Sequence, residues 1–120
     1  YDLGGRARFD VRDFSSHEFL MPSMGFHLDI LRALNRSGVT PVIRTTQVSD
    51  SVIISMVEHG LGVSILSELV LRGRRDNVVA VPLDPPAVRE LGIAVRSKKE
   101  LRPIARRFIT EARDIIRQIK

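Results

Sequence analysis

Residues 51–66 read SVIISMVEHGLGVSIL, and the hydrophobic period changes in the middle of this stretch. The apolar residues of its first half recur at helical spacing and form one stripe: Val52, Ile53, Met56 and Val57. Gly60 can adopt the left-handed conformation that ends a helix. Residues 61–65 then have the pattern of a short apolar strand, in which Gly62 lets a neighbouring backbone or ligand come close. A helix, a glycine stop and a buried strand are typical of an α/β fold.

Strand and helix signals alternate along the rest of the chain. Residues 1–17 are polar and irregular, because Gly4 and Gly5 interrupt any early element. Strands are predicted over residues 18–21, 42–46, 78–81 and 91–95, and helices from Ser23 to Gly38, from Ser49 or Asp50, over residues 67–71 and from Pro103 onward. This alternation predicts an α/β fold with a mostly parallel sheet and helices on both faces.

The composition is that of an ordinary globular protein. With 120 residues, 43% of them hydrophobic and 28% charged, the chain is long enough for one modest core. The lack of cysteine removes disulfides and thiolate metal sites. The longest uncharged apolar run, residues 61–66, is far too short to cross a bilayer, and no signal peptide precedes the fold. These features predict a cytoplasmic protein with no membrane partner.

Charge is distributed unevenly between the two halves. Residues 1–60 carry six arginines and seven acidic residues, whereas residues 61–120 carry 13 basic and seven acidic residues. A basic half can bind nucleic acid or an anionic membrane surface, or it can be a solvated helix face. The spacing favours the solvated face, because the basic residues of the last predicted helix lie mostly outside its apolar stripe. That stripe consists of Ile104, Phe108, Ala112, Ile115, Ile116 and Ile119.

No pattern of catalytic or metal-binding residues stands out. The usual metal-binding spacings do not occur among the three histidines, which are His17, His27 and His59. Ser23 lies in Pro-Ser-Met-Gly, which is not the nucleophile elbow of a hydrolase. The glycine pair Gly60 and Gly62 precedes a strand, whereas the dinucleotide fingerprint follows one. We therefore predict no enzymatic activity, no catalytic residue, no metal site and no cofactor.

Two segments place the end of a strand next to the start of a helix. In α/β sheets, ligands bind beyond the carboxyl ends of the strands, where free backbone N–H groups of helix starts suit a carboxylate or another small anion. The candidate ligand-binding residues are Pro22, Ser23, Met24, Gly25, Thr46, Gln47, Val48 and Ser49. The alternative is that Ser23 and Ser49 are ordinary helix caps, which are more common than ligand sites.

An ordered set of motifs resembles a known family. The segment MVEHGLGVSILS at residues 56–67 is followed by VAVPL at 79–83, RELGIAV at 89–95 and PIARRF at 103–108. In this order, the segments resemble the effector-binding domain of LysR-type transcriptional regulators. The resemblance covers residues 18–110 and is carried by the set rather than by any single motif.

The resemblance implies a type 2 periplasmic-binding-protein-like fold. It implies an effector-binding subdomain II over residues 15–83 and, over residues 84–120, a C-terminal segment that returns to subdomain I. A small-molecule effector, a carboxylate or another anion, would lie in the cleft between subdomains, where the two candidate segments match cleft-lining positions. Family members form homo-oligomers (dimers, or tetramers of the whole regulator) and bind DNA through an N-terminal winged helix-turn-helix that this chain lacks.

Two other functional classes were weighed. A stand-alone periplasmic-type solute-binding module would have the same fold, and a secretion leader with an intact first subdomain would favour it. A small basic nucleic-acid-binding protein would need aromatic residues for stacking or a recognition helix. The chain has five phenylalanines and one tyrosine, mostly at core-like spacings. We therefore favour an effector-sensing domain that modulates transcription.

Overall fold

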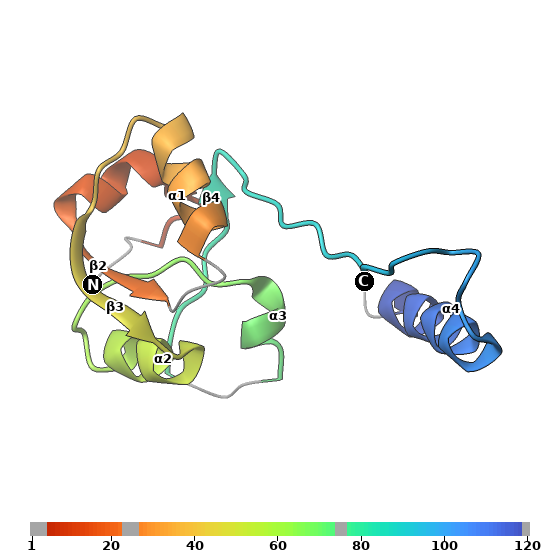
Figure 1. The fold of residues 1–120 in the computed structure, drawn as a ribbon. Helices are drawn as coiled ribbons and strands as arrows, with labels where there is room; N and C mark the ends of the chain where they lie inside the picture. Colours follow the sequence, from red (N-terminus) through yellow and green to blue (C-terminus); the bar gives the residue numbers. More distant parts are fainter. Residues whose placement is uncertain (1–4, 23–26, 74–76, 119–120) are drawn as a thin grey trace. The chain divides into compact units, whose positions relative to one another are not determined.

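The chain forms two units, Tyr1–Arg89 and Glu90–Lys120, in the computed structural model. The structure describes residues 5–22, 27–73 and 77–118. Within this part, the first unit contains all the strands and three of the α-helices, and the second contains a single helix (Figure 1). No helix of the described ranges combines the length and the apolar character that crossing a membrane requires.

Two small parallel sheets organise the first unit. Strand β2 (Glu18–Pro22) pairs with β3 (Val42–Val48), and β1 (Phe9–Asp10) pairs with β4 (Leu83–Asp84). On the other side of β2, Val63 forms a parallel bridge to Phe19. The Val63 N–H donates to the Glu18 carbonyl and the Leu20 N–H donates to the Val63 carbonyl, both at 2.9 Å. The predicted α/β class with parallel pairing is confirmed at this level.

The four predicted helices are present, although the predicted start of the first helix at Ser23 lies outside the described residues. Helix α1 spans His27–Arg36, α2 Asp50–Glu58, α3 Glu68–Leu71 and α4 Pro103–Gln118. Gly38 and Gly60 follow α1 and α2 with φ angles of 67° and 73°, the left-handed conformation expected after a helix end. The Ser67 hydroxyl caps α3 by accepting a hydrogen bond from the Leu69 N–H at 3.4 Å.

Gly62 lies where the sequence predicted a close approach. A Cβ atom at this position would be 2.6 Å from the Glu18 carbonyl oxygen and 2.9 Å from the Leu20 Cγ. The segment 61–65 therefore runs against β2 with no room for a side chain at Gly62. The predicted strand is reduced, however, to the single bridge at Val63.

The N-terminal segment differs from its prediction. Residues 1–17 were expected to be irregular, but Phe9–Asp10 form β1 and Val11–Ser16 form the 3-10 helix η1. Phe9, Val11 and Phe14 are buried, and the Phe14 ring lies 4.6 Å from Phe9 and 5.3 Å from Phe19 between ring centroids. A two-residue strand joined to a 3-10 helix has no long hydrophobic period, which is why the pattern did not reveal this part of the core.

Two predicted strands are wrong. Residues 78–81 and 91–95 are not strands, and the nearby strand is β4 at Leu83–Asp84. Val79 and Leu91 are 78% and 70% exposed. An apolar run becomes a strand only where a neighbouring strand can accept its backbone hydrogen bonds, and β1 offers such a neighbour only to β4.

The core of the first unit surrounds β2. Its buried members are Phe9, Val11, Phe14, Phe19, Leu20, Met21, Ile30, Leu34, Val39, Ile53 and Ile54. Helix α1 contributes Ile30 and Leu34, which share one face of the helix, and Leu31 packs partly buried against the cluster. The sequence predicts Phe26 on the same apolar face, and Phe26 lies outside the described residues. This core holds β2 and its two helical neighbours in place at the edge described next.

Candidate functional site

The carboxyl ends of β2 and β3 meet at one edge of their sheet. Because the strands are parallel, Pro22 at the end of β2 is the register partner of Val48 at the end of β3. Helix α1 is described from His27 onward, and α2 begins at Asp50 directly after the N-cap Ser49. Figure 1 shows β2 and β3 side by side, with α2 continuing from β3. The chain therefore brings the two predicted strand ends together.

The eight predicted ligand-binding residues fall into three groups. Pro22, Val48 and Ser49 are described in full: Pro22 is buried, Val48 is half-buried and Ser49 is exposed. Thr46 and Gln47 belong to β3, but their side chains lie outside the described part, as do Ser23, Met24 and Gly25 altogether. The pairing of Pro22 with Val48 is thus the geometry on which the site depends.

Ser49 occupies the N-cap position of α2 without acting as a side-chain cap. Its backbone is extended (φ −68°, ψ 156°), and its carbonyl accepts the Ile53 N–H at 3.0 Å. The hydroxyl makes no capping hydrogen bond to the helix backbone. The first-turn N–H groups of α2 therefore receive nothing from Ser49, and both the hydroxyl and these donors can face a ligand or water.

Acidic residues lie in the first turn of both helices. Asp50 begins α2, and Asp29 lies in the first turn of α1. Carboxylates stabilise helix starts by offsetting the positive end of the macrodipole. An anion at this edge would consequently be held by directed N–H and hydroxyl hydrogen bonds more than by a net positive field.

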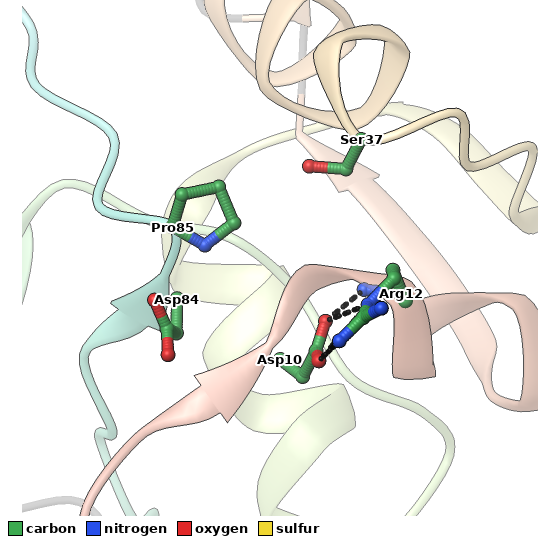
Figure 2. A pocket seen from close by; sticks show the side chains of 5 residues that line it. All are labelled: Asp10, Arg12, Ser37, Asp84 and Pro85. Carbon is green, nitrogen blue, oxygen red and sulfur yellow. Dashed lines mark hydrogen bonds and ion pairs between the residues drawn. The ribbon is translucent and has the colours of Figure 1, made fainter.

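Away from this edge, a hollow of about 230 Å³ opens at the ends of β1 and β4. It is lined by Asp10, Arg12, Ser37, Asp84 and Pro85 (Figure 2). Asp10 and Asp84 are register partners across the parallel pair. The Arg12 guanidinium donates to both Asp10 oxygens, at 2.6 Å from Nη2 and 3.0 Å from Nε, and the Arg12 N–H donates to Oδ1 at 2.8 Å. These hydrogen bonds lower the pKa of Asp10 from 3.8 to about 2.

This hollow was not predicted, and its chemistry is structural. Asp10 is the N-cap of η1, so the ion pair and the cap fasten the start of that helix. The only sequence signal was an Asp two residues before an Arg, which is common on protein surfaces. Because Arg12 already occupies both Asp10 oxygens, we assign the cluster to the local fold.

Comparison with known protein families decides the kind of domain. The model of the LysR substrate binding domain matches residues 1–117. The chain belongs to the LysR substrate-binding domain family. The predicted resemblance is confirmed, and it extends beyond the residues 18–110 on which it was based.

A curated relative of this LysR domain is an uncharacterised HTH-type transcriptional regulator, YvbU, from Bacillus subtilis (strain 168). The two are 28% identical over 119 residues, which cover 96% of this chain and 40% of that protein. The chain thus spans less than half the length of the relative. No solved structure matches the chain.

Membership of this family bears on the predicted function in two respects. LysR substrate-binding domains belong to transcriptional regulators and are not enzymes, as predicted. The family also implies a small-molecule effector.

The structure also places two of the three histidines. His17 and His59 each use Nδ1 for a hydrogen bond of 2.8 Å, to the carbonyls of Asp13 and Ser55, respectively. Within residues 5–22, 27–73 and 77–118, no group of three potential metal ligands comes together.

Proposed function

We propose that this LysR domain senses a small-molecule effector at the edge where β2 and β3 end, and that binding there modulates transcription by the whole regulator. The observation that carries the proposal is the parallel register of Pro22 with Val48, which places the carboxyl ends of the two strands next to each other. In parallel α/β sheets, this edge is where ligands bind. The predicted residues, from Pro22 to Gly25 and from Thr46 to Ser49, lie in or beside these connections.

The proposed effector carries a carboxylate or another small anionic group. The support is the uncapped start of α2, where the Ser49 hydroxyl is not engaged with the helix backbone. Backbone N–H groups at a helix start bind anions by hydrogen bonding and by the helix dipole. Since Asp50 offsets part of that dipole, the ligand needs groups that complement individual donors, which favours a specific organic anion over an inorganic one.

The finer architecture and the partners follow from the family. We propose a type 2 periplasmic-binding-protein-like arrangement, with subdomain II over residues 15–83 and the return segment of subdomain I over residues 84–120. The exposed apolar residues of α4, Ile104 at 78% and Phe108 at 67%, support packing of this helix on another part of the regulator. The name of the Bacillus relative supports DNA binding through a separate helix-turn-helix domain. We further propose a cytoplasmic homo-oligomer, a dimer or a tetramer of the whole protein.

Amide NMR of the 120-residue chain tests the location of the site. We would titrate sodium acetate and sodium benzoate at constant ionic strength, with sodium chloride as the reference. The expected result is saturable shifts confined to the amides of residues 23–28 and 46–52. Shifts spread evenly over the arginine-rich surface would contradict the proposed site.

Matched serine variants test the role of the α2 start. Ser49→Ala should weaken binding of the responding anion by about 0.5–1.5 kcal/mol, because one neutral hydrogen bond is lost. Ser55→Ala, the same change at an exposed residue six positions further along the chain, should leave binding unchanged. Equal affinity of the Ser49→Ala variant and the unmodified chain would remove Ser49 from the site.

A further inference from the structure

One ion pair ties the end of the first unit to α1. Arg89 Nε donates to Asp29 Oδ2 at 2.9 Å, across 60 residues of sequence. Arg89 is the last residue of the first unit, and Asp29 lies in the first turn of α1. The contact therefore lies where the chain leaves the first unit.

Arg89 is less exposed than the residues on either side of it, in the segment that joins the first unit to the second. Residues 84–88 and 90–94 are all exposed, and Val88 reaches 93% exposure. The Arg89 side chain, by contrast, is only 22% exposed. Between Pro85, which lines the hollow described above, and residue 94, Arg89 is the one residue that is not exposed, and its side chain donates a charge-assisted hydrogen bond to Asp29.

Asp29 forms ion pairs with two arginines that differ in distance and in exposure. Its other oxygen, Oδ1, faces Arg32 Nη1 at 3.4 Å, a longer contact within the same helix, and the Arg32 side chain is 72% exposed. Exposed pairs three residues apart on a helix contribute little. The shorter, less exposed contact with Arg89 is the one that restrains a separate part of the chain.

We propose that the Asp29–Arg89 ion pair is a latch that holds the start of the inter-unit connection against α1 and opens when the pair is screened or broken. An open latch frees residues 86–89 from the first unit and lengthens the connection that leads to α4. Because α1 also starts at the proposed effector site, the latch joins that site and the connection to the same helix. This last consequence rests on the proposed function, whereas the latch itself does not.

Tryptic cleavage of the 120-residue chain reads the latch directly, because trypsin must accept the Arg89 side chain to cut the Arg89–Glu90 bond. Mass spectrometry would give the initial rates at Arg89 and at Arg96, which is exposed in the same connection. Asp29→Asn should raise the ratio of the Arg89 rate to the Arg96 rate about two- to fivefold, the range for a partly exposed ion pair. Sodium chloride at 1 M should raise the same ratio in the unmodified chain.

Two further variants separate the latch from a general effect on α1. Arg32→Gln removes the other partner of Asp29 and should leave the ratio unchanged. Arg89→Gln leaves α1 intact, and a glutamate-specific protease should then cut after Glu90 about two- to fivefold faster than in the unmodified chain.

Unchanged cleavage in both Asp29→Asn and Arg89→Gln would overturn the latch. So would a uniform rise in Asp29→Asn at every basic residue, including Arg36 within α1, because it would show general loosening of the first unit. These outcomes do not depend on any effector. The proposed binding site is therefore tested separately, by the NMR titration, and the two proposals can fail independently.

Discussion

Replacement of Gly62 by alanine should destabilise the first unit, because the added methyl group has no free space. The new Cβ would lie 2.6 Å from the Glu18 carbonyl oxygen and 2.9 Å from the Leu20 Cγ. Both residues belong to β2, and Leu20 is fully buried, so neither neighbour can move without disturbing the core. Overpacking of this kind costs about 1–3 kcal/mol.

The same substitution also threatens the hydrogen bonds beside it. If residues 61–65 move away from β2, the two bonds between Val63 and β2 lengthen from 2.9 Å. Each such bond contributes about 0.5–1.5 kcal/mol. Together with the steric term, we expect Gly62→Ala to lower the free energy of unfolding by about 2–4 kcal/mol.

Urea denaturation followed by far-UV circular dichroism measures this effect. With a slope of about 2 kcal/mol per M, the middle of the usual range, the loss should move the midpoint down by about 1–2 M. The matched control is Gly92→Ala, because no atom lies within 4 Å of a Cβ at that position and its φ is not in the left-handed region. The control should stay within about 0.5 kcal/mol of the unmodified chain. Equal midpoints for the two variants would refute the close approach of residues 61–65 to β2.

Two further predictions concern Asp10 and the core. The pKa of Asp10 is about 2 in the folded chain and 3.8 without its partners, so its stabilisation is present above pH 3.8 and is lost as the pH falls toward 2. Urea midpoints between pH 4.5 and 2.5 should therefore fall more steeply for the unmodified chain than for Asp10→Asn, and parallel curves would contradict the role of Arg12. Leu34→Ala, at a side chain with 0% exposure, should cost about 2–5 kcal/mol, whereas Leu69→Ala, at 53% exposure, should cost less than about 0.5 kcal/mol in the same assay.

The elements that the sequence predicted well are those defined by neighbouring residues. The end of α2 depends on Gly60, and the start of α3 depends on Ser67, both of which act within one helical turn. The need for glycine at position 62 was also visible, because a glycine inside an apolar run marks a close approach. The residue that it approaches, Glu18, could not be predicted, because that contact joins segments 44 residues apart.

The errors arise where a partner distant in sequence decides the structure. Leu83–Asp84 becomes a strand because Phe9–Asp10 lies beside it, and neither two-residue segment has a strand pattern of its own. The more apolar residues 78–81 have no such neighbour and remain without regular structure. Local β-propensity thus predicted a strand close to the observed one. The observed strand lies a few residues later in the sequence, because its position is set by pairing with β1.

The candidate site lies between these two cases. Each strand-to-helix connection could be found locally, since Pro22 ends a strand and Ser49 precedes a helix. That the two connections are adjacent follows only from the parallel register of Pro22 with Val48. The sequence also suggested that Ser49 was an ordinary cap, but its hydroxyl does not bond the helix backbone. Residue identity predicted the position of Ser49, and only the geometry showed that its hydroxyl does not cap α2.

Helices α1 and α4 show why an apolar stripe alone does not predict burial. Both stripes have helical spacing, yet Ile30 and Leu34 in α1 are at most 4% exposed, whereas Ile104 and Phe108 in α4 are 78% and 67% exposed. The hydrophobic gain requires a surface to pack against, and α1 finds one in β2 and the aromatic cluster of Phe9, Phe14 and Phe19. For α4, we propose that this surface lies in another part of the regulator, because the Bacillus relative extends beyond the matched region, which is 40% of its length. In the first unit, the same kind of stripe is stabilised by the core around β2.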